Sequence, residues 1–409
     1  MGETVQKTIL DNGIRIVSEK IDYGQSVSLG VWIATGSRNE SKDLNGISHL
    51  LEHMIFKGTS SRSAYEIATS LESLGGSLNA FTDREFTCFY ATVLEENLSQ
   101  AVDVLGDIIQ NAVLDENDLF NEKHIIFEEI KELEDTPEDF VQDSLVQLIF
   151  DDHSLGLSTL GSYESVEKIK RDDIVEYKKK FYTPNNIIVA AAGRVNHDFL
   201  VELVQQFFQS FPQRPSTFLE PFKLGNVTFK KINSSIKQTH ITKGTLAYSY
   251  NDPRKYPLMV LNTVLGGGMS SRLFQDLREK QGLAYSVYSL VDLWSDTGLW
   301  SVYIGTSPQN SEKVLQLINE ELNKVYETGI SAVELKRTKS QLKGNFILNM
   351  EDISSRMNRL AKMELYSQNY IPIDEVVSRV EAVSQEDIRS LAHELLDRGK
   401  IYTAIIEPE

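Results

Sequence analysis

The residues with the clearest capacity for chemistry lie in the segment His49-Leu50-Leu51-Glu52-His53. Residues four apart on a helix share a face, so the two imidazoles can converge on one metal ion. Glu52 lies near the same face and can reach a water molecule beside that ion. The order H-x-x-E-H predicts a zinc-dependent hydrolytic site; the alternative is an amphipathic helix with two histidines on its polar side.

A third metal ligand must come from elsewhere in the chain, because a catalytic zinc site usually has three protein ligands. Cys88 is the single cysteine, and no second pair of histidines has ligand spacing, so we expect a carboxylate. The acidic segment 115–135 offers many candidates. Glu122 and Glu129 are seven positions apart and share a helical face, while Glu128 points elsewhere. Spacing alone leaves these three carboxylates in contention.

Composition narrows the class of protein. The chain has 409 residues, with 41 Lys and Arg against 59 Asp and Glu, and a formal net charge of −18. Such a charge argues against general nucleic-acid binding, which needs excess positive charge. The chain begins without the pattern of a secretory signal, and no apolar run approaches the roughly 20 residues that span a bilayer. We therefore expect a cytoplasmic protein without a membrane or nucleic-acid partner.

The elements that must position the motif follow from hydrophobic period and from turn and capping residues. Asn12-Gly13 predicts a hairpin turn, and Ser63 with Glu66 predicts a capping box at the start of a helix. The predicted strands cover residues 27–34 and, as a pair, 77–93. The predicted helices cover residues 45–56, 95–110, 115–135 and, without a break, 332–366.

A weak internal repeat suggests two copies of one fold. The pattern beginning Val166-Glu167 recurs at Val380-Glu381, and the same offset along the chain relates two pairs of strands. Coincidence among common patterns is the alternative. Each half mixes hairpin-connected strands with long helices, which predicts an α+β fold with largely antiparallel sheets. We expect an N-terminal domain at residues 1–215, a proline-containing linker at 216–225 and a C-terminal domain at 226–409.

The run from Gly46 to Thr59 resembles the active-site signature of the pitrilysin-type (inverzincin, M16) metallopeptidases. The similarity is closest to the branch of the mitochondrial processing peptidase β subunit and its bacterial relatives. It extends over nearly the whole chain, through the segments 79–82, 122–129 and 266–274. The resemblance implies a LuxS/metallohydrolase-like fold whose two similar domains form half of a clamshell.

The same resemblance implies roles for individual residues. The family's spacing between the second histidine and the third ligand leads to Glu129, and the family's outer carboxylate is Glu122. An extended substrate would lie along the strand that contains Asn79, Ala80 and Phe81. The expected cofactor is one Zn²⁺ per chain, held by three side chains. These ligands are His49, His53 and Glu129.

The second half has no counterpart of the metal motif, because the offset of the repeat carries the motif onto Thr263 to Gly267. It contains Arg278 and Tyr285, which resemble an arginine and a tyrosine that the family brings to the active site. The alternative for both is a packing role. Since metal motif and Arg/Tyr pair stand on one chain, the resemblance implies a homodimer with two equivalent sites.

The predicted function is a zinc endopeptidase that cleaves extended or unfolded peptides, with Glu52 as the general base and with Tyr285 and Arg278 assisting. Residues 115–143 carry a net charge of −10, which suggests a preference for basic peptides; a solvated outer face is the alternative. Two other functions stay open. One is a peptide-binding or core-type partner subunit without activity, and the other is a zinc hydrolase acting on another substrate.

Overall fold

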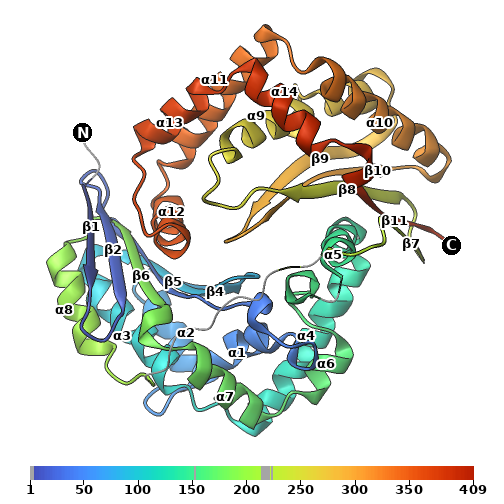
Figure 1. Ribbon diagram of the computed structural model, residues 1–409. Helices are drawn as coiled ribbons and strands as arrows, with labels where there is room; N and C mark the ends of the chain where they lie inside the picture. The colour runs from blue at the N-terminus through green and yellow to red at the C-terminus, as the bar shows by residue number, and fades with distance from the viewer. Residues whose placement is uncertain (1–3, 152, 213–221, 223) are drawn as a thin grey trace. The chain divides into compact units, whose positions relative to one another are not determined.

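The computed structural model describes residues 4–151, 153–212, 222 and 224–409 (Figure 1). The chain divides into two compact units, and each unit is assembled from three separate stretches of sequence. Unit 1 comprises Met1–Lys131, Leu157–Pro221 and Asn349–Tyr370. Unit 2 comprises Glu132–Gly156, Phe222–Leu348 and Ile371–Glu409. Most of the predicted linker, residues 216–221 and 223, lies outside the described residues.

Unit 1 is built on a six-stranded sheet with the order β1-β2-β6-β3-β5-β4. Its strands are β1 (Thr4–Ile9), β2 (Arg15–Lys20), β3 (Ser26–Ile33), β4 (Ser77–Thr82), β5 (Thr87–Leu94) and β6 (Ile187–Gly193). Only the β2–β6 pair is parallel; the other neighbours are antiparallel. The predicted hairpin is present, and Gly13 occupies its turn with a φ of 103°.

Helices cover both faces of this sheet (Figure 1). The described helices of unit 1 are α1 (Ile47–Ile55), α2 (Ala64–Glu72), α3 (Leu98–Asn111), α4 (Glu116–Asp135, which runs past the end of unit 1), α6 (Tyr163–Lys168), α7 (Arg171–Phe181), α8 (His197–Phe207) and α12 (Ile353–Tyr366). Ser63 and Glu66 form the predicted capping box at α2. Strand β6 is buried along its whole length, because α12 packs on one face and the main core of the unit lies on the other.

Helix α12 is held to the sheet by matched small and charged residues. A Cβ atom at Gly30 on β3 would come within 2.6 Å of Met357 Sδ, so only glycine leaves room for the helix there. The indole of Trp32 donates a hydrogen bond to the same sulfur at 3.4 Å. Arg356 forms an ion pair with Glu19, whose side chain on β2 is only 2% exposed. The helix is therefore part of the folded core of unit 1.

Replacing Arg356 by Ala is expected to destabilise unit 1 by about 3 kcal/mol, because it removes the guanidinium that faces a buried carboxylate. Hydrogen–deuterium exchange should become faster in β2 and β6, while exchange in the sheet of unit 2 stays unchanged. Arg389→Ala, at an exposed position of unit 2, is the matched control. Equal protection of β2 and β6 in the variant and the wild type would contradict this prediction.

Unit 2 is built on a five-stranded sheet with the order β7-β11-β8-β10-β9. Its strands are β7 (Phe229–Ser234), β8 (Thr239–Ala247), β9 (Ala284–Leu293), β10 (Gly298–Thr306) and β11 (Tyr402–Pro408). Its helices are α5 (Pro137–Phe150), α9 (Lys255–Gly266), the π-helix η6 (Phe274–Lys280), α10 (Ser311–Thr328), α11 (Ala332–Asn349, which ends in the first residue of unit 1), α13 (Ile373–Ala382) and α14 (Gln385–Leu395). Seven 3₁₀ turns complete the described elements: η1 (Ser37–Asn39), η2 (Lys42–Leu44), η3 (Glu95–Asn97), η4 (Ser154–Gly156), η5 (Pro184–Asn186), η7 (Pro308–Asn310) and η8 (Arg398–Lys400).

The repeat predicted from the sequence is present in the two sheets. The offset that separates Val166 from Val380 carries the bounds of β2 onto those of β7, and it brings β3 and β6 almost onto β8 and β11. The strand order and the single parallel pair also recur, as β2–β6 in unit 1 and β7–β11 in unit 2. The prediction of an α+β fold with two similar, largely antiparallel sheets is confirmed. None of the described helices is both long and apolar enough to cross a membrane.

The compact units differ from the continuous domains expected at 1–215 and 226–409, because two helices each pack on the sheet formed by the other half of the sequence. Helix α5 comes from the first half of the sequence but packs on β8 and β11 of unit 2. Helix α12, which the offset of the repeat relates to α5, comes from the second half but packs on unit 1. Gly244 makes room for Leu145 of α5 as Gly30 does for Met357.

The prediction of one unbroken helix at residues 332–366 is wrong. Helix α11 ends at Asn349, and α12 begins after Asp352, whose side chain accepts a hydrogen bond from the backbone of Ser355 at 2.7 Å. An N-terminal cap marks the beginning of a separate helix. The chain passes from unit 2 to unit 1 at this break.

Candidate metal centre

Helix α1 presents the H-x-x-E-H motif on one side and packs into the core with the other. Its fully buried face consists of Ile47, Leu50, Leu51, Met54 and Ile55. His49 and His53 lie on the opposite side, with ring centroids 4.5 Å apart. The apolar period thus decides which way the imidazoles point, since rotating the helix would expose five large side chains to water.

Glu40 secures the beginning of α1. Its carboxylate accepts hydrogen bonds from the backbone amides of Gly46, at 2.7 Å, and Ser48, at 2.8 Å. The side-chain amide of Asn45 donates a third at 2.9 Å. Glu40 therefore holds the turn that immediately precedes His49.

The stability contribution of Glu40 is expected to depend on pH. Burial raises the pKa of Glu40 from 4.5 to about 7, although its hydrogen-bond donors act in the other direction. Because the folded-state pKa exceeds the unfolded one, the stabilisation is complete below about pH 4.5 and is lost as pH rises through about 7. The free energy of unfolding of the wild type, relative to Glu40→Gln, should therefore fall between pH 5 and pH 8. Urea unfolding with a chelator present measures it; a constant difference would contradict the prediction.

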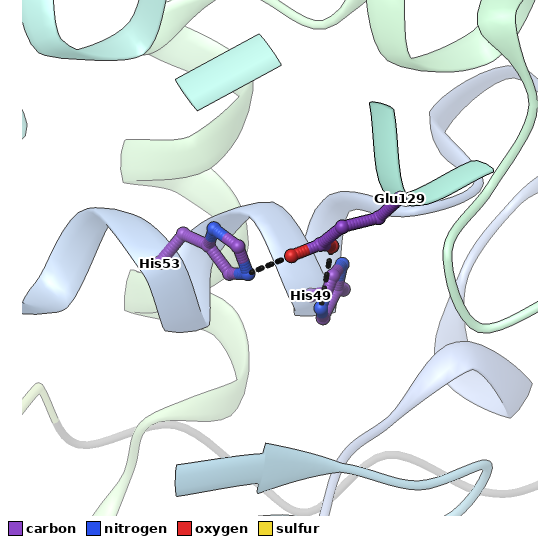
Figure 2. Close-up of side chains that lie close together, drawn as sticks. All are labelled: His49, His53 and Glu129. Atoms are coloured by element: carbon purple, nitrogen blue, oxygen red, sulfur yellow. Dashed lines mark ion pairs between the residues drawn. The ribbon is translucent and has the colours of Figure 1, made fainter. Parts of the chain in front are cut away.

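The third member of the cluster is Glu129 on α4, as Figure 2 shows. Its two carboxylate oxygens lie 3.6 Å from His49 Nε2 and 3.7 Å from His53 Nε2. The potential ligand atoms of the three residues all lie within 4.8 Å of one another. In the described part of the chain, this is the one group of three or more histidine, cysteine or acidic residues arranged to hold a metal ion.

His53 is oriented by a carboxylate behind it. Its Nδ1 lies 3.0 Å from Glu122 Oε2, and the other oxygen of Glu122 lies 2.7 Å from Lys57 Nζ. Because a carboxylate accepts a hydrogen bond here, the proton belongs on Nδ1 and the lone pair on Nε2, which faces Glu129. Such carboxylate–histidine pairs orient metal ligands and raise their basicity.

The residues fit a zinc ion. Two imidazole nitrogens and one carboxylate oxygen are a ligand set that zinc accepts at catalytic sites. Burial, reinforced by His53, lowers the pKa of His49 to about 3, which keeps its ring in the neutral form that binds metal. Within the described residues, His49 Nδ1 is buried and has no hydrogen-bond partner. Coordination of the ring through Nε2, the nitrogen that faces Glu129, would offset part of the cost of burying the ring.

Glu52 lies beside the cluster but outside the ligand set. The residue is 8% exposed, and burial raises the pKa of its carboxyl above the usual range. The hydroxyl of Thr82 donates a hydrogen bond to Glu52 Oε2 at 2.5 Å. A buried carboxylate with a raised pKa, held by one hydroxyl, suits the acceptance and release of a proton.

The other residues singled out in the sequence lie on separate elements. Asn79, Ala80 and Phe81 belong to β4, which is the edge strand of its sheet and packs against α1. Arg278 lies in the π-helix η6, and Tyr285 on β9 is 68% exposed. Both belong to unit 2, and their part in a reaction stays a prediction.

Three residues at or near the site were missed in the sequence. Lys57 lies four positions after His53, so helical spacing could have placed it near Glu122. Glu40 and Thr82 carry no such signal. Glu40 reaches Gly46 and Ser48 only because the segment before α1 folds back on the helix, and Thr82 reaches Glu52 only because β4 packs against α1.

Comparison with known proteins establishes the family. Residues 15–162 match the insulinase family (peptidase family M16), and residues 168–342 match the peptidase M16 inactive domain. The uncharacterized zinc protease YmxG of Bacillus subtilis is 41% identical over 96% of this chain and 95% of its own length. An uncharacterized zinc protease of Streptomyces coelicolor is 38% identical over 97% of this chain and 88% of its own length. The chain belongs to peptidase family M16.

Solved structures share the fold. A protease from Helicobacter pylori superposes with a TM-score of 0.92, covering 99% of this chain and 100% of that one, at 22% identity. A peptidase M16 inactive domain from Pseudomonas fluorescens also has a TM-score of 0.92, covering 99% of this chain and 98% of that one, at 19% identity. At these identities the likeness concerns the fold alone.

Proposed function

We propose that this protein is a zinc-dependent endopeptidase that cleaves extended or unfolded peptides. The observation that carries the proposal is the convergence of His49, His53 and Glu129 with the buried Glu52 beside them. The name zinc protease borne by its relatives supports the same metal and the same reaction class. His49, His53 and Glu129 would hold the ion.

Zinc bound there would supply Lewis-acid chemistry, lowering the pKa of a water molecule and polarising a carbonyl group. Glu52 then takes a proton from the water that attacks the peptide carbonyl. The same carboxyl group delivers that proton to the leaving nitrogen. Glu122 keeps His53 in its tautomer throughout the reaction.

Strand β4 supports the choice of an extended peptide as substrate. It pairs with β5 on one side and forms the edge of the sheet on the other. An edge strand can accept an extended peptide through main-chain hydrogen bonds, which are largely independent of sequence. The backbone amide of Ala80 donates to Asn79 Oδ1 at 2.8 Å, a bond that an incoming peptide would replace.

We further propose a homodimer in which Arg278 and Tyr285 of one chain assist the site of the other. Tyr285 is exposed, so its hydroxyl group is accessible and can donate a hydrogen bond to a developing oxyanion. A symmetric dimer would contain two equivalent sites.

A peptide library with quenched fluorescence tests the proposed function. The zinc-loaded chain should cleave library peptides, and a chelator should stop the cleavage. The match of residues 168–342 to an inactive domain makes binding without cleavage the second candidate. Retention of labelled peptides by the zinc-loaded chain without any cleavage would favour that candidate. Hydrolysis of non-peptide esters or amides alone would favour a different zinc hydrolase.

A further inference from the structure

The hydroxyl of Thr82 connects the buried Glu52 to the edge of the sheet. Thr82 is the last residue of β4, and its Oγ1 donates to Glu52 Oε2 at 2.5 Å. Within the part of the chain that the structure describes, this is the hydrogen bond that the Glu52 carboxylate accepts. One side chain of the hairpin thus decides how the carboxylate is turned.

The hairpin that carries Thr82 is itself firmly held. The amide of Arg38 donates to the carbonyl of Arg84 in the β4–β5 turn at 2.8 Å. Arg38 also forms a buried ion pair with Glu85 of the turn at 2.6 Å. The backbone at Gly36 approaches so closely that a Cβ atom there would meet the carbonyl of Asp83 at 2.0 Å. The Thr82 hydroxyl, which donates to the Glu52 carboxylate, is therefore held in a fixed position.

A carboxylate without such a donor is free to turn. The terminal torsion of a glutamate side chain is broad, with no sharply preferred setting. A reacting group must be held within about 0.5 Å and 10–20° of its productive geometry. A single short hydrogen bond from a fixed hydroxyl restricts that torsion to one setting.

We propose that Thr82 is a positioning residue. It orients the Glu52 carboxylate relative to β4, the strand along which an extended peptide would pair. The inference rests on the proposed peptidase function. Thr82 lies in the same strand as Asn79 and Ala80, so a peptide paired along β4 reaches the hydroxyl and the carboxylate together. Thr82 contributes to turnover by orienting Glu52, and it contributes little to binding.

The test compares two replacements in the zinc-loaded chain. Thr82→Val keeps the branched shape and removes the hydroxyl, while Thr82→Ser keeps the hydroxyl. We expect Thr82→Val to lower kcat by about 10- to 100-fold, as losses of orienting hydrogen bonds at metal sites do. KM and bound zinc should stay within about twofold of the wild type, and Thr82→Ser should recover most of kcat.

The matched control is Thr87→Val in the paired position on β5. Thr87 lies opposite Thr82, and its hydroxyl donates to the backbone carbonyl of Thr35 at 3.1 Å. The control loses a buried hydroxyl from the same hairpin, so it should lower the melting temperature but leave kcat unchanged. A fall of kcat in the control equal to that of Thr82→Val would assign the effect to the hairpin and overturn the proposal.

A second readout does not depend on activity. Crystals of zinc-free Thr82→Val should show the Glu52 carboxylate in more than one orientation, against a single orientation in the wild type. Wild-type kcat in Thr82→Val, or equal losses in the valine and serine variants, would overturn the proposal. If zinc-loaded wild type cleaves no peptide, the proposed function fails, and the crystal comparison still decides whether Thr82 orients Glu52.

Discussion

Glu52→Gln is expected to lower the rate of peptide cleavage by at least about 100-fold while the protein still binds zinc. The amide has nearly the same shape but cannot take a proton from water, and general-base catalysis contributes about 10²- to 10⁴-fold. Because Glu52 lies outside the group of potential ligand atoms, zinc content should stay at the wild-type level. Turnover of a library-derived peptide, with metal analysis of the same samples, measures both quantities.

The matched control for this variant is Glu72→Gln, at an exposed position near the end of α2. Its kcat should equal that of the wild type. Zinc-bound Glu52→Gln that cleaves peptides within about threefold of the wild-type rate would refute the role of Glu52. A variant that loses zinc together with activity would instead place Glu52 among the ligands.

Glu129→Gln is expected to have the second large effect, the loss of tight zinc binding. It replaces the carboxylate whose oxygens lie 3.6 and 3.7 Å from the two histidines. Mutation of an outer partner typically costs about 10- to 100-fold in metal affinity, so loss of a ligand should cost more than that. Competition with a chromogenic chelator measures the affinity.

Thermal unfolding provides an independent measure of the same loss. Zinc at about 100 times its dissociation constant should stabilise the folded wild type by about 2.7 kcal/mol, and this gain should shrink in Glu129→Gln.

The neighbouring carboxylates of α4 supply graded controls for Glu129. Glu128→Gln changes an exposed residue and should leave zinc affinity unchanged. Glu122→Gln removes the partner of His53 and should fall between the two, with a loss of about 10- to 100-fold. Unchanged affinity in Glu129→Gln, or a larger loss in Glu128→Gln, would show that the ligand has been misassigned.

Those same carboxylates show how far the sequence could predict the site. The spacing of Glu122 and Glu129 correctly indicated that they share a face, yet it left Glu128 in contention. The choice depends on how α4 is rotated against α1, and buried residues such as Ile126 and Ile130 set that rotation. The family resemblance selected Glu129, and the structure places it beside both histidines. The choice of Glu129 therefore depends partly on local spacing within α4 and partly on how α4 packs against α1.

The fold, like the site, could be predicted from the sequence only in part. Strand alternation and capping residues predicted the hairpin at Gly13 and the capped start of α2, and the recurrence of one pattern at a constant offset predicted the repeated sheet. Nothing in the local pattern indicated that α5 and α12 pack on the sheets of opposite halves. The sheet on which each helix packs depends on close fit, as between Gly30 and Met357 or between Gly244 and Leu145.

The sequence by itself determined the helix that carries His49, Glu52 and His53, because helical period and ligand spacing are properties of neighbouring residues. It also determined the class of fold. Only the tertiary structure decided three other features. They are the packing of α5 and α12 on the sheets of the opposite halves, the cap that Glu40 provides, and the hydrogen bond from Thr82 to Glu52. The contacts of α5, α12 and Thr82 join elements that are distant in the chain, and Glu40 reaches Gly46 and Ser48 because the segment before α1 folds back on the helix. Such contacts follow from how elements and loops pack rather than from the spacing of residues within one element.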